Sequence, residues 1–212
     1  MDRSDRHPTT EDDVRPGILD EAAAPARGDK RERVLEAALE LFTERGFHGT
    51  PMPLVAERAG VAAGTIYRYF ESKEALVNAL FQEWHGRMSE ELFGDFPWDE
   101  PLRLQFHLYW QRAARFAFRH PKAYSFLSLH FHAPYLDDRS RESIEQHWQR
   151  GREYFGAASE QQVTKALPAD LLVLVLDGVF TGMFRCHMLG MVEINEELIQ
   201  AVEECAWAAI RR

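Results

Sequence analysis

The sequence contains little cysteine. Only Cys186 and Cys205 occur in 212 residues, and they show neither the CxxC spacing of redox sites nor the ligand spacing of zinc sites. Two cysteines are also too few for the disulfide framework of a small secreted protein. We therefore expect a protein of the reducing cytoplasm, with no metal site and no cofactor.

Long hydrophobic runs are also missing. The longest run, 171-LLVLVLDGVF-180, contains Asp177 and is much shorter than the roughly 20 apolar residues that span a bilayer. The N-terminus is polar and acidic, so we expect no signal peptide. These features predict a protein that is not associated with a membrane.

The sequence also lacks the alternating apolar and polar residues of half-buried strands. This absence predicts an all-α fold. The net charge of −9 excludes a generic polyanion binder, although a small basic face can coexist with an acidic body.

What the sequence does contain is helical periodicity from about residue 29 onward. Residues 1–28 carry three prolines and few apolar residues, which is typical of a disordered tail. Beyond them, Gly46, the cap candidates Thr50 and Ser72, and several prolines punctuate the chain. This punctuation predicts a first helix from about residue 30 to Gly46, followed by helices at 53–59, 62–70, 73–93, 101–119, 122–132, 139–160, 168–189 and 195–211.

Two short predicted helices, 53–59 and 62–70, are joined by a turn at Gly60. Such a pair, packed under a preceding helix, is the arrangement of a helix-turn-helix, whose second helix enters the DNA major groove. Ile66 and Phe70 are four residues apart and are expected to face inward. The small residues Ala62 to Thr65 would let the backbone approach DNA, and the Tyr67-Arg68-Tyr69 segment would face outward.

Positions 30 to 84 resemble the DNA-binding domain of the tetracycline-repressor (TetR) family of bacterial regulators. The resemblance is carried by 33-RVLEAALELFTERGFHGT-50 and 54-LVAERAGVAAGTIYRYFESKEAL-76. It implies a DNA-binding domain at 29–74 and a helical ligand-binding and dimerisation domain at 75–212. Carried over position by position, it also implies the DNA contacts Thr50, Ala63, Gly64, Thr65, Tyr67, Arg68, Tyr69 and Lys73.

Two features distinguish this chain from the family pattern. The family often has Ser at position 62 and Lys or Pro at position 63, whereas this chain has Ala62 and Ala63. The missing N-cap costs the recognition helix about 1 kcal/mol. Residues 29–85 also hold seven basic and nine acidic residues, so DNA binding must depend on the placement of a few cations, among them Lys30 at the start of the first helix.

Aromatic residues are concentrated in the middle of the chain, where residues 81–155 contain 17 of the 25. One interpretation is a large core. The other, implied by the family resemblance, is a cavity for an apolar or aromatic effector, lined by Trp84, Met88, Phe106, Trp110, Phe126, Phe131 and Trp148. The histidines in this region show poor metal-ligand spacing, since His130 and His132 are only two residues apart.

The last two predicted helices carry much apolar surface. They would form either a monomer core or, with the same pair from a second chain, a four-helix dimer interface. The candidate interface residues are Leu172, Leu176, Val179, Phe180, Met183, Leu198, Val202 and Cys205.

The leading hypothesis is a homodimeric transcriptional regulator, not an enzyme. It would bind a palindromic double-stranded DNA operator and, as a repressor, be released by a small effector. A histidine-metal hydrolase and a helical adaptor that binds only protein are the alternatives, but no HExxH motif or Ser-His-Asp order supports the former.

Overall fold

The computed structural model describes residues 29–212, so the tail predicted at 1–28 lies outside the described residues. Residues 29–212 form nine α-helices and no extended strand, and the all-α prediction is confirmed. The helices are α1 (Lys30–Arg45), α2 (Met52–Arg58), α3 (Ala63–Ile66), α4 (Lys73–Phe93), α5 (Leu102–Arg119), α6 (Pro121–His130), α7 (Asp138–Glu160), α8 (Ala169–Met188) and α9 (Glu196–Ile210).

Local capping explains where several of these helices begin. Asp29 and Glu32 form a reciprocal capping box at the start of α1, and the Ser72 hydroxyl accepts a hydrogen bond of 3.0 Å from the Ala75 amide at the start of α4. Asp137 and Asn195 cap α7 and α9 in the same way. These side chains satisfy amides that otherwise have no partner in the first helical turn.

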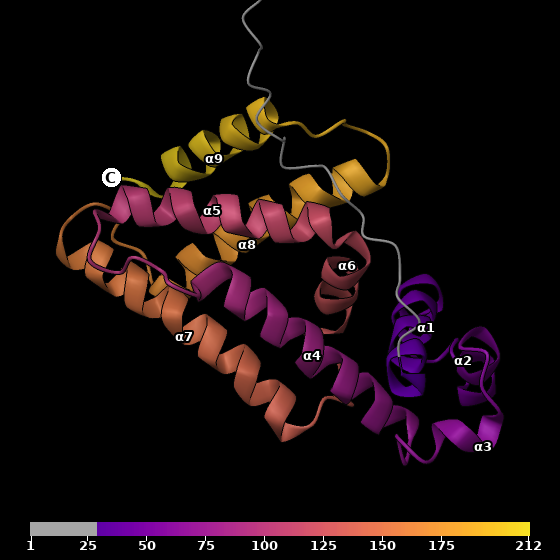
Figure 1. The fold of residues 1–212 in the computed structure, drawn as a ribbon. Coiled ribbons are helices and arrows are strands. Elements are labelled where there is room, and N and C mark those ends of the chain that lie inside the picture. The colour runs from indigo at the N-terminus through magenta and orange to yellow at the C-terminus, as the bar shows by residue number, and fades with distance from the viewer. Residues whose placement is uncertain (1–28) are drawn as a thin grey trace, which may run out of the picture.

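The nine helices form a small N-terminal unit and a larger body (Figure 1). Helices α1, α2 and α3 gather at one end, and α1 packs against α6 and α4. Helix α4 extends from this unit into the body, where it packs against α5 and α7. It runs without a break across the predicted domain boundary at residues 74 and 75, so α4 connects the two parts mechanically.

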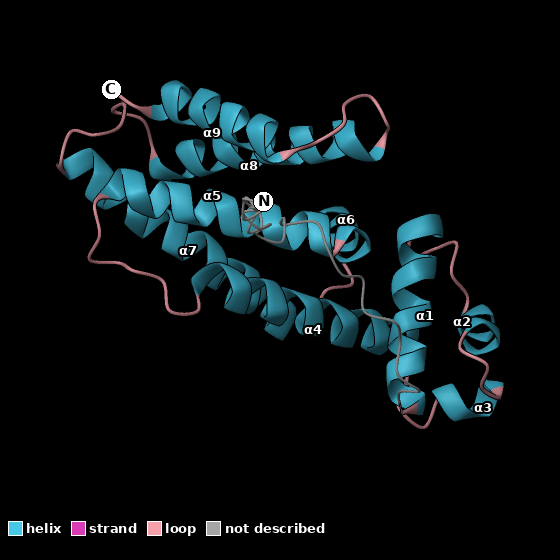
Figure 2. Cartoon of the chain, turned by 45° about the horizontal axis from the view of Figure 1, so that its top comes forward, coloured by secondary structure: helices cyan, strands magenta, loops and turns pink. Residues whose placement is uncertain are grey.

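Helices α8 and α9 lie side by side on the part of the body remote from α2 and α3 (Figure 2). Helix α8 is apolar nearly all round, and its 20 residues are long and apolar enough to cross a membrane by length and composition. Core helices of soluble proteins pass the same test. Only 22% of the apolar window in α8 is buried, and one side of the helix, which includes Leu171 and Leu174, is exposed in a single chain.

Candidate functional site

The α2–α3 unit is held by the two apolar residues that helical spacing predicted. Ile66 is fully buried and Phe70 is 4% exposed, and both belong to the same core as α1 and α4. Gly60 adopts a φ of 63° in the turn before α3, a conformation that suits glycine. The predicted helix-turn-helix packing is therefore present.

Helix α3 is shorter than predicted, because it ends at Ile66 instead of Phe70. Hydrogen bonds from the Tyr69 and Phe70 amides to the Ile66 carbonyl continue the chain as a tight turn. No side chain caps the start of α3, where Ala62 occupies the N-cap position. The absent cap, predicted from the sequence, removes one stabilising interaction from an element of only four residues.

The outward surface of this unit contains most of the predicted DNA contacts. Tyr67 is 53% exposed and Tyr69 is 40% exposed, and between them Arg68 is also exposed. Open space surrounds the Cα of Gly64 on its side-chain side. The structure thus places the accessible backbone of Gly64 and three large polar side chains on one exposed segment, together with Ala63 and the half-buried Thr65.

Two of the exposed cations remain available for a polyanion. The ion pairs found among residues 29–212 include neither Lys30 nor Arg68. Arg31 and Arg58, in contrast, lie near Glu83 and Glu40. Cations without a carboxylate partner can approach phosphate without first losing an ion pair.

Thr50 is a correction to the sequence-based expectation. The residue is fully buried, and its hydroxyl donates toward the carbonyls of Leu41 and Gly46, at 3.1 and 2.9 Å. Pro51 occupies the N-cap position of α2, with no side-chain cap. Thr50 therefore closes the turn between α1 and α2, and its side chain neither caps α2 nor reaches the surface.

Lys73 also differs from the expectation of an outward-facing lysine. Its ammonium donates a 2.9 Å hydrogen bond to the Phe47 carbonyl and lies 4.2 Å from the centre of the Phe47 ring. Both contacts tie the start of α4 to the loop after α1. Sequence patterns do not indicate this role, because Phe47 and Lys73 are far apart along the chain.

The same loop forms a contact with the body that local sequence patterns do not reveal. The Phe47 ring stacks on the Tyr135 ring, with 3.9 Å between their centres. The Tyr135 carbonyl accepts a 2.8 Å hydrogen bond from the Asn78 side chain, and the Tyr135 hydroxyl lies 2.6 Å from His130 Nδ1. This aromatic stack adds to the packing of α1 against α4 and α6 and joins the loop after α1 to the body.

The body contains a cavity of about 340 Å³, a size typical of small-molecule sites. Of the predicted lining residues, Met88, Phe106, Trp110, Phe131 and Trp148 lie on its wall. Trp84 and Phe126 do not, and both predictions were wrong. Trp84 packs beside His120, and Phe126 is fully buried between Phe42 and Phe81.

A few polar side chains interrupt the apolar wall. His85 and His147 lie 5.9 Å apart between ring centres. Burial, with a smaller contribution from the Arg150 cation, lowers the pKa of His85 to about 4. Burial, then the neighbouring His85 and Arg150, lowers the pKa of His147 to about 3. Both imidazoles are therefore neutral at pH 7, and Arg150 supplies positive charge to this side of the cavity.

The predicted dimer residues divide into three groups. Leu172, Phe180 and Met183 are buried within the chain, so the expectation that they face a partner was wrong; Phe180 and the half-buried Leu176 line the cavity instead. Val179, Leu198 and Val202 are half-buried, and Cys205 is exposed. Helix α8 is apolar nearly all round, so the periodicity of its apolar residues did not distinguish its inner face from its outer face.

The uncovered face of α8 and α9 combines leucines with small residues. On α8 it contains Leu171, Leu174, Gly178 and Gly182, all exposed and three or four residues apart. On α9, the exposed Ala201 and Cys205 are four residues apart. Open space surrounds the Cα atoms of Gly178 and Gly182, so another helix could approach this face closely.

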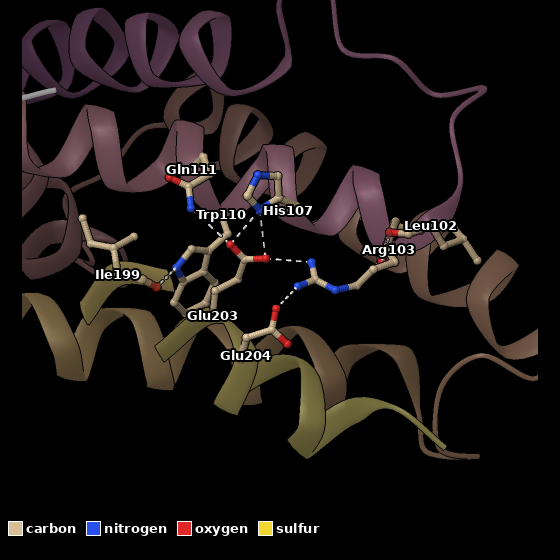
Figure 3. A network of polar contacts seen from close by, with 9 residues as sticks. Leu102, Arg103, His107, Trp110, Gln111, Ile199, Glu203 and Glu204 are labelled. Carbon is tan, nitrogen blue, oxygen red and sulfur yellow. Dashed lines mark hydrogen bonds and ion pairs between the residues drawn. The ribbon is translucent and has the colours of Figure 1, made fainter. Parts of the chain in front are cut away.

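A buried carboxylate fixes α9 to α5 (Figure 3). Glu203 is fully buried, and its oxygens lie 2.7 Å from Arg103 Nη1 and 2.9 Å from His107 Nδ1. The Gln111 amide donates a third hydrogen bond of 3.1 Å. These partners compensate the cost of burying the charge, and the network sets the position of α9 relative to the cavity helices.

Two family models match the chain. The model described as "Bacterial regulatory proteins, tetR family" matches residues 34–80. The model described as "Tetracyclin repressor-like, C-terminal domain" matches residues 81–212. The two matches meet within α4 and together cover all of the described helices except the first turn of α1.

Curated relatives match in the N-terminal unit. The fatty acid metabolism regulator protein of Bacillus subtilis is 39% identical over 66 residues, and the HTH-type transcriptional repressor KstR of Rhodococcus jostii is 46% identical over 66 residues. Each match covers 31% of this chain, and 34% and 31% of the relatives. The chain thus matches about a third of the length of these relatives.

Solved structures match over most of the chain. A TetR-family protein from Vibrio parahaemolyticus has a TM-score of 0.66 and 28% identity, covering 87% of this chain and 100% of that one. A second, from Shewanella sp. PV-4, has a TM-score of 0.74, 23% identity and the same coverage, and it shows the shared fold. The chain belongs to the TetR family of bacterial transcriptional regulators, which are DNA-binding proteins and not enzymes.

Proposed function

We propose that this protein is a homodimeric repressor that binds a palindromic DNA operator and is released from it by a small apolar or aromatic effector in the cytoplasm. The observation that carries the proposal is the exposed Tyr67-Arg68-Tyr69 segment, anchored by the buried Ile66 and Phe70. Rigid anchoring holds the three side chains in a fixed position for the major groove.

The proposed DNA contacts are divided by chemistry. Arg68 suits guanine or phosphate, and the two tyrosines offer hydroxyls to phosphates and ring faces to thymine methyl groups. Ala63, Gly64 and Thr65 let the backbone approach the groove, and Lys30 adds a phosphate contact. Lys73 contributes by holding the Phe47 loop, and Thr50 by closing the turn before α2.

The uncovered face of α8 and α9 is the proposed dimer interface. Its leucines supply apolar area, and Gly178 and Gly182 allow close packing against the same helices of a second chain. A two-fold axis there pairs two DNA-binding units, which is what recognition of two half-sites about 34 Å apart requires.

Effector control would act through α4. This helix contributes His85 and Met88 to the cavity wall, and its first residue, Lys73, holds the Phe47 carbonyl in the DNA-binding unit. An effector that bound more tightly to the protein with α4 in one of its orientations would favour one distance between the two DNA-binding units of the dimer. Operator affinity would then fall by the coupling free energy between the two sites.

Selection from a random-sequence DNA library tests this function and identifies the operator in the same experiment. Full-length protein should enrich an inverted repeat, and the complex should weaken steeply with salt because phosphate contacts release counterions. Failure to enrich any sequence at 50 mM salt would contradict the proposal.

A further inference from the structure

The cavity lies next to a groove on the surface of the body. The groove lies between the segment before α5 and helix α7. Four residues line both the cavity and the groove, and they define the neck between the two spaces: Trp98, Gln105, Arg150 and Tyr154. A ligand in the cavity would therefore have one end next to these side chains.

Arg150 is the cation of this neck, and its charge has no carboxylate partner. Its Nη1 atom donates a 3.0 Å hydrogen bond to the Ser89 hydroxyl, and its guanidinium lies 4.6 Å from the centre of the Phe93 ring. No ion pair found among residues 29–212 includes it. A guanidinium beside an apolar cavity, with free donors, matches the geometry of a carboxylate.

The interior beyond the neck is mostly apolar and aromatic. Its polar atoms include His147 Nδ1, which is buried and has no hydrogen-bond partner. Because the imidazole is neutral, it can interact with a ligand without adding a second charge. This interior suits an apolar body with a single polar end.

The groove outside the neck has the opposite charge. Asp99, Glu100 and Glu153 line it, and none of them takes part in an ion pair within the described part of the chain. These carboxylates would repel a ligand that carried several negative charges outside the cavity. A ligand with a single negative charge could pair with Arg150. A ligand with a polyphosphate group would have to place further negative charges in the groove, beside these carboxylates.

We propose that the cavity binds a free apolar carboxylic acid, with its carboxylate on Arg150 at the neck and its hydrocarbon or aromatic body inside. This inference rests on the proposed effector site and names its ligand class. The volume of about 340 Å³ lies in the range of small-molecule sites and suits a small ligand of this class.

A cationic ligand is less favoured by the same geometry. Asp177 is the acidic residue on the cavity wall, but it is exposed and is not one of the four neck residues. An amine that paired with it would leave the neck guanidinium without an anion. The alternative still belongs in the experiment as a competing ligand.

The test is direct binding to the full-length protein, followed by tryptophan fluorescence, because Trp98, Trp110 and Trp148 all line the cavity. The probes are decanoate, decanol, decylamine and decanoyl-coenzyme A. Decanoate should bind at least tenfold more tightly than each of the other three.

Arg150→Met should weaken the binding of decanoate at least tenfold and leave the binding of decanol unchanged. Arg139→Met is the matched control, since Arg139 lies on the same helix, is exposed and lies outside the cavity lining, and it should have no effect.

Equal binding of decanol, tighter binding of decylamine or of the thioester, or no binding of decanoate would each overturn the inference. The wild-type ligand series decides the matter even if Arg150→Met fails to fold. Because DNA selection is performed without ligand, loss of acid binding alongside retained operator binding would refute this inference and leave DNA recognition intact. Acid binding without any change in operator affinity would support the inference and refute effector control.

Discussion

At the scale of single residues, segment 66–70 shows how neighbouring side chains take opposite roles. Ile66 and Phe70 are buried, whereas the three residues between them are exposed. The spacing of four residues predicted that Ile66 and Phe70 share the buried face. The exposure of Tyr69 also depends on the tight turn that follows α3. The roles of Thr50 and Lys73 could not be predicted in this way, since their partners are carbonyl groups whose positions depend on the turns of the folded chain.

The first prediction concerns the exposed segment. Tyr67→Ala and Arg68→Ala should each weaken binding to the selected operator by about 1–3 kcal/mol, while the midpoint of thermal unfolding stays unchanged. Fluorescence anisotropy with labelled DNA measures the affinity. Arg115→Ala removes an equally exposed arginine from α5 and is the matched control. Equal losses in all three variants would show that only overall charge matters.

The second prediction concerns pH and His130, which is 1% exposed. Burial lowers the pKa of His130 to about 4, so between about pH 6.5 and pH 4 the unfolded state binds more protons than the folded state. The free energy of unfolding should therefore decrease as pH falls through this range, by roughly 3 kcal/mol from this residue.

Urea titrations at several pH values measure this effect. His130→Gln should reduce the pH dependence of the free energy of unfolding, and the lowered pKa values of His85 and His147 should maintain the remainder. His48→Gln, at an exposed position, should leave the pH dependence as in the wild type. Identical slopes for the wild type and His130→Gln would contradict the assignment.

At the scale of helices, the boundaries could be predicted from the sequence better than the orientations. Gly46, Ser72 and the prolines at 101, 121 and 168 mark helix ends to within one or two residues of those observed, because caps and breakers act locally. Orientation depends on tertiary packing. The apolar residues of α8 lie nearly all round the helix and did not indicate which face is buried. Trp84 and Phe126 lie away from the cavity because they pack against other aromatic rings, which the sequence pattern does not reveal.

The third prediction concerns the attachment of α9 to α5. Glu203→Ala should lower the free energy of unfolding by about 2 kcal/mol, because it removes the hydrogen bonds that the Glu203 carboxylate accepts from Arg103, His107 and Gln111. Glu204 contacts the same arginine, but its side chain is 59% exposed, and Glu204→Ala should cost less than about 1 kcal/mol. Urea unfolding compares the two. A cost for Glu203→Ala no larger than that for Glu204→Ala would contradict a structural role for the network.

At the scale of the whole molecule, the proposed account links three places on one chain. The α2–α3 unit lies at one end of the molecule, and α8 and α9 lie on the part remote from it (Figures 1 and 2). The cavity is lined by helices of the body. Helix α4 joins the DNA-binding unit to the cavity, and the Glu203 network positions α9. A sequence can indicate each place by its residues, but only the fold reveals that one helix connects them.

The fourth prediction concerns assembly. Leu171→Glu places a charge on the proposed dimer interface and should convert a dimer into a monomer, since an unpaired charge in an apolar interface is costly. Sedimentation velocity measures the change in mass. Leu129→Glu alters a leucine on α6 that is 60% exposed, and this control should remain dimeric. A dimeric Leu171→Glu variant would place the interface elsewhere.

The central claim is that two DNA-binding units, paired by α8 and α9, recognise one operator together. The most direct test compares the affinity of the full-length protein for the selected inverted repeat and for a single half-site at the same salt concentration. The account predicts two chains on the inverted repeat, much tighter binding there than on the half-site, and loss of this difference in Leu171→Glu. Equal affinity for the two DNAs, with one chain on each, would contradict it.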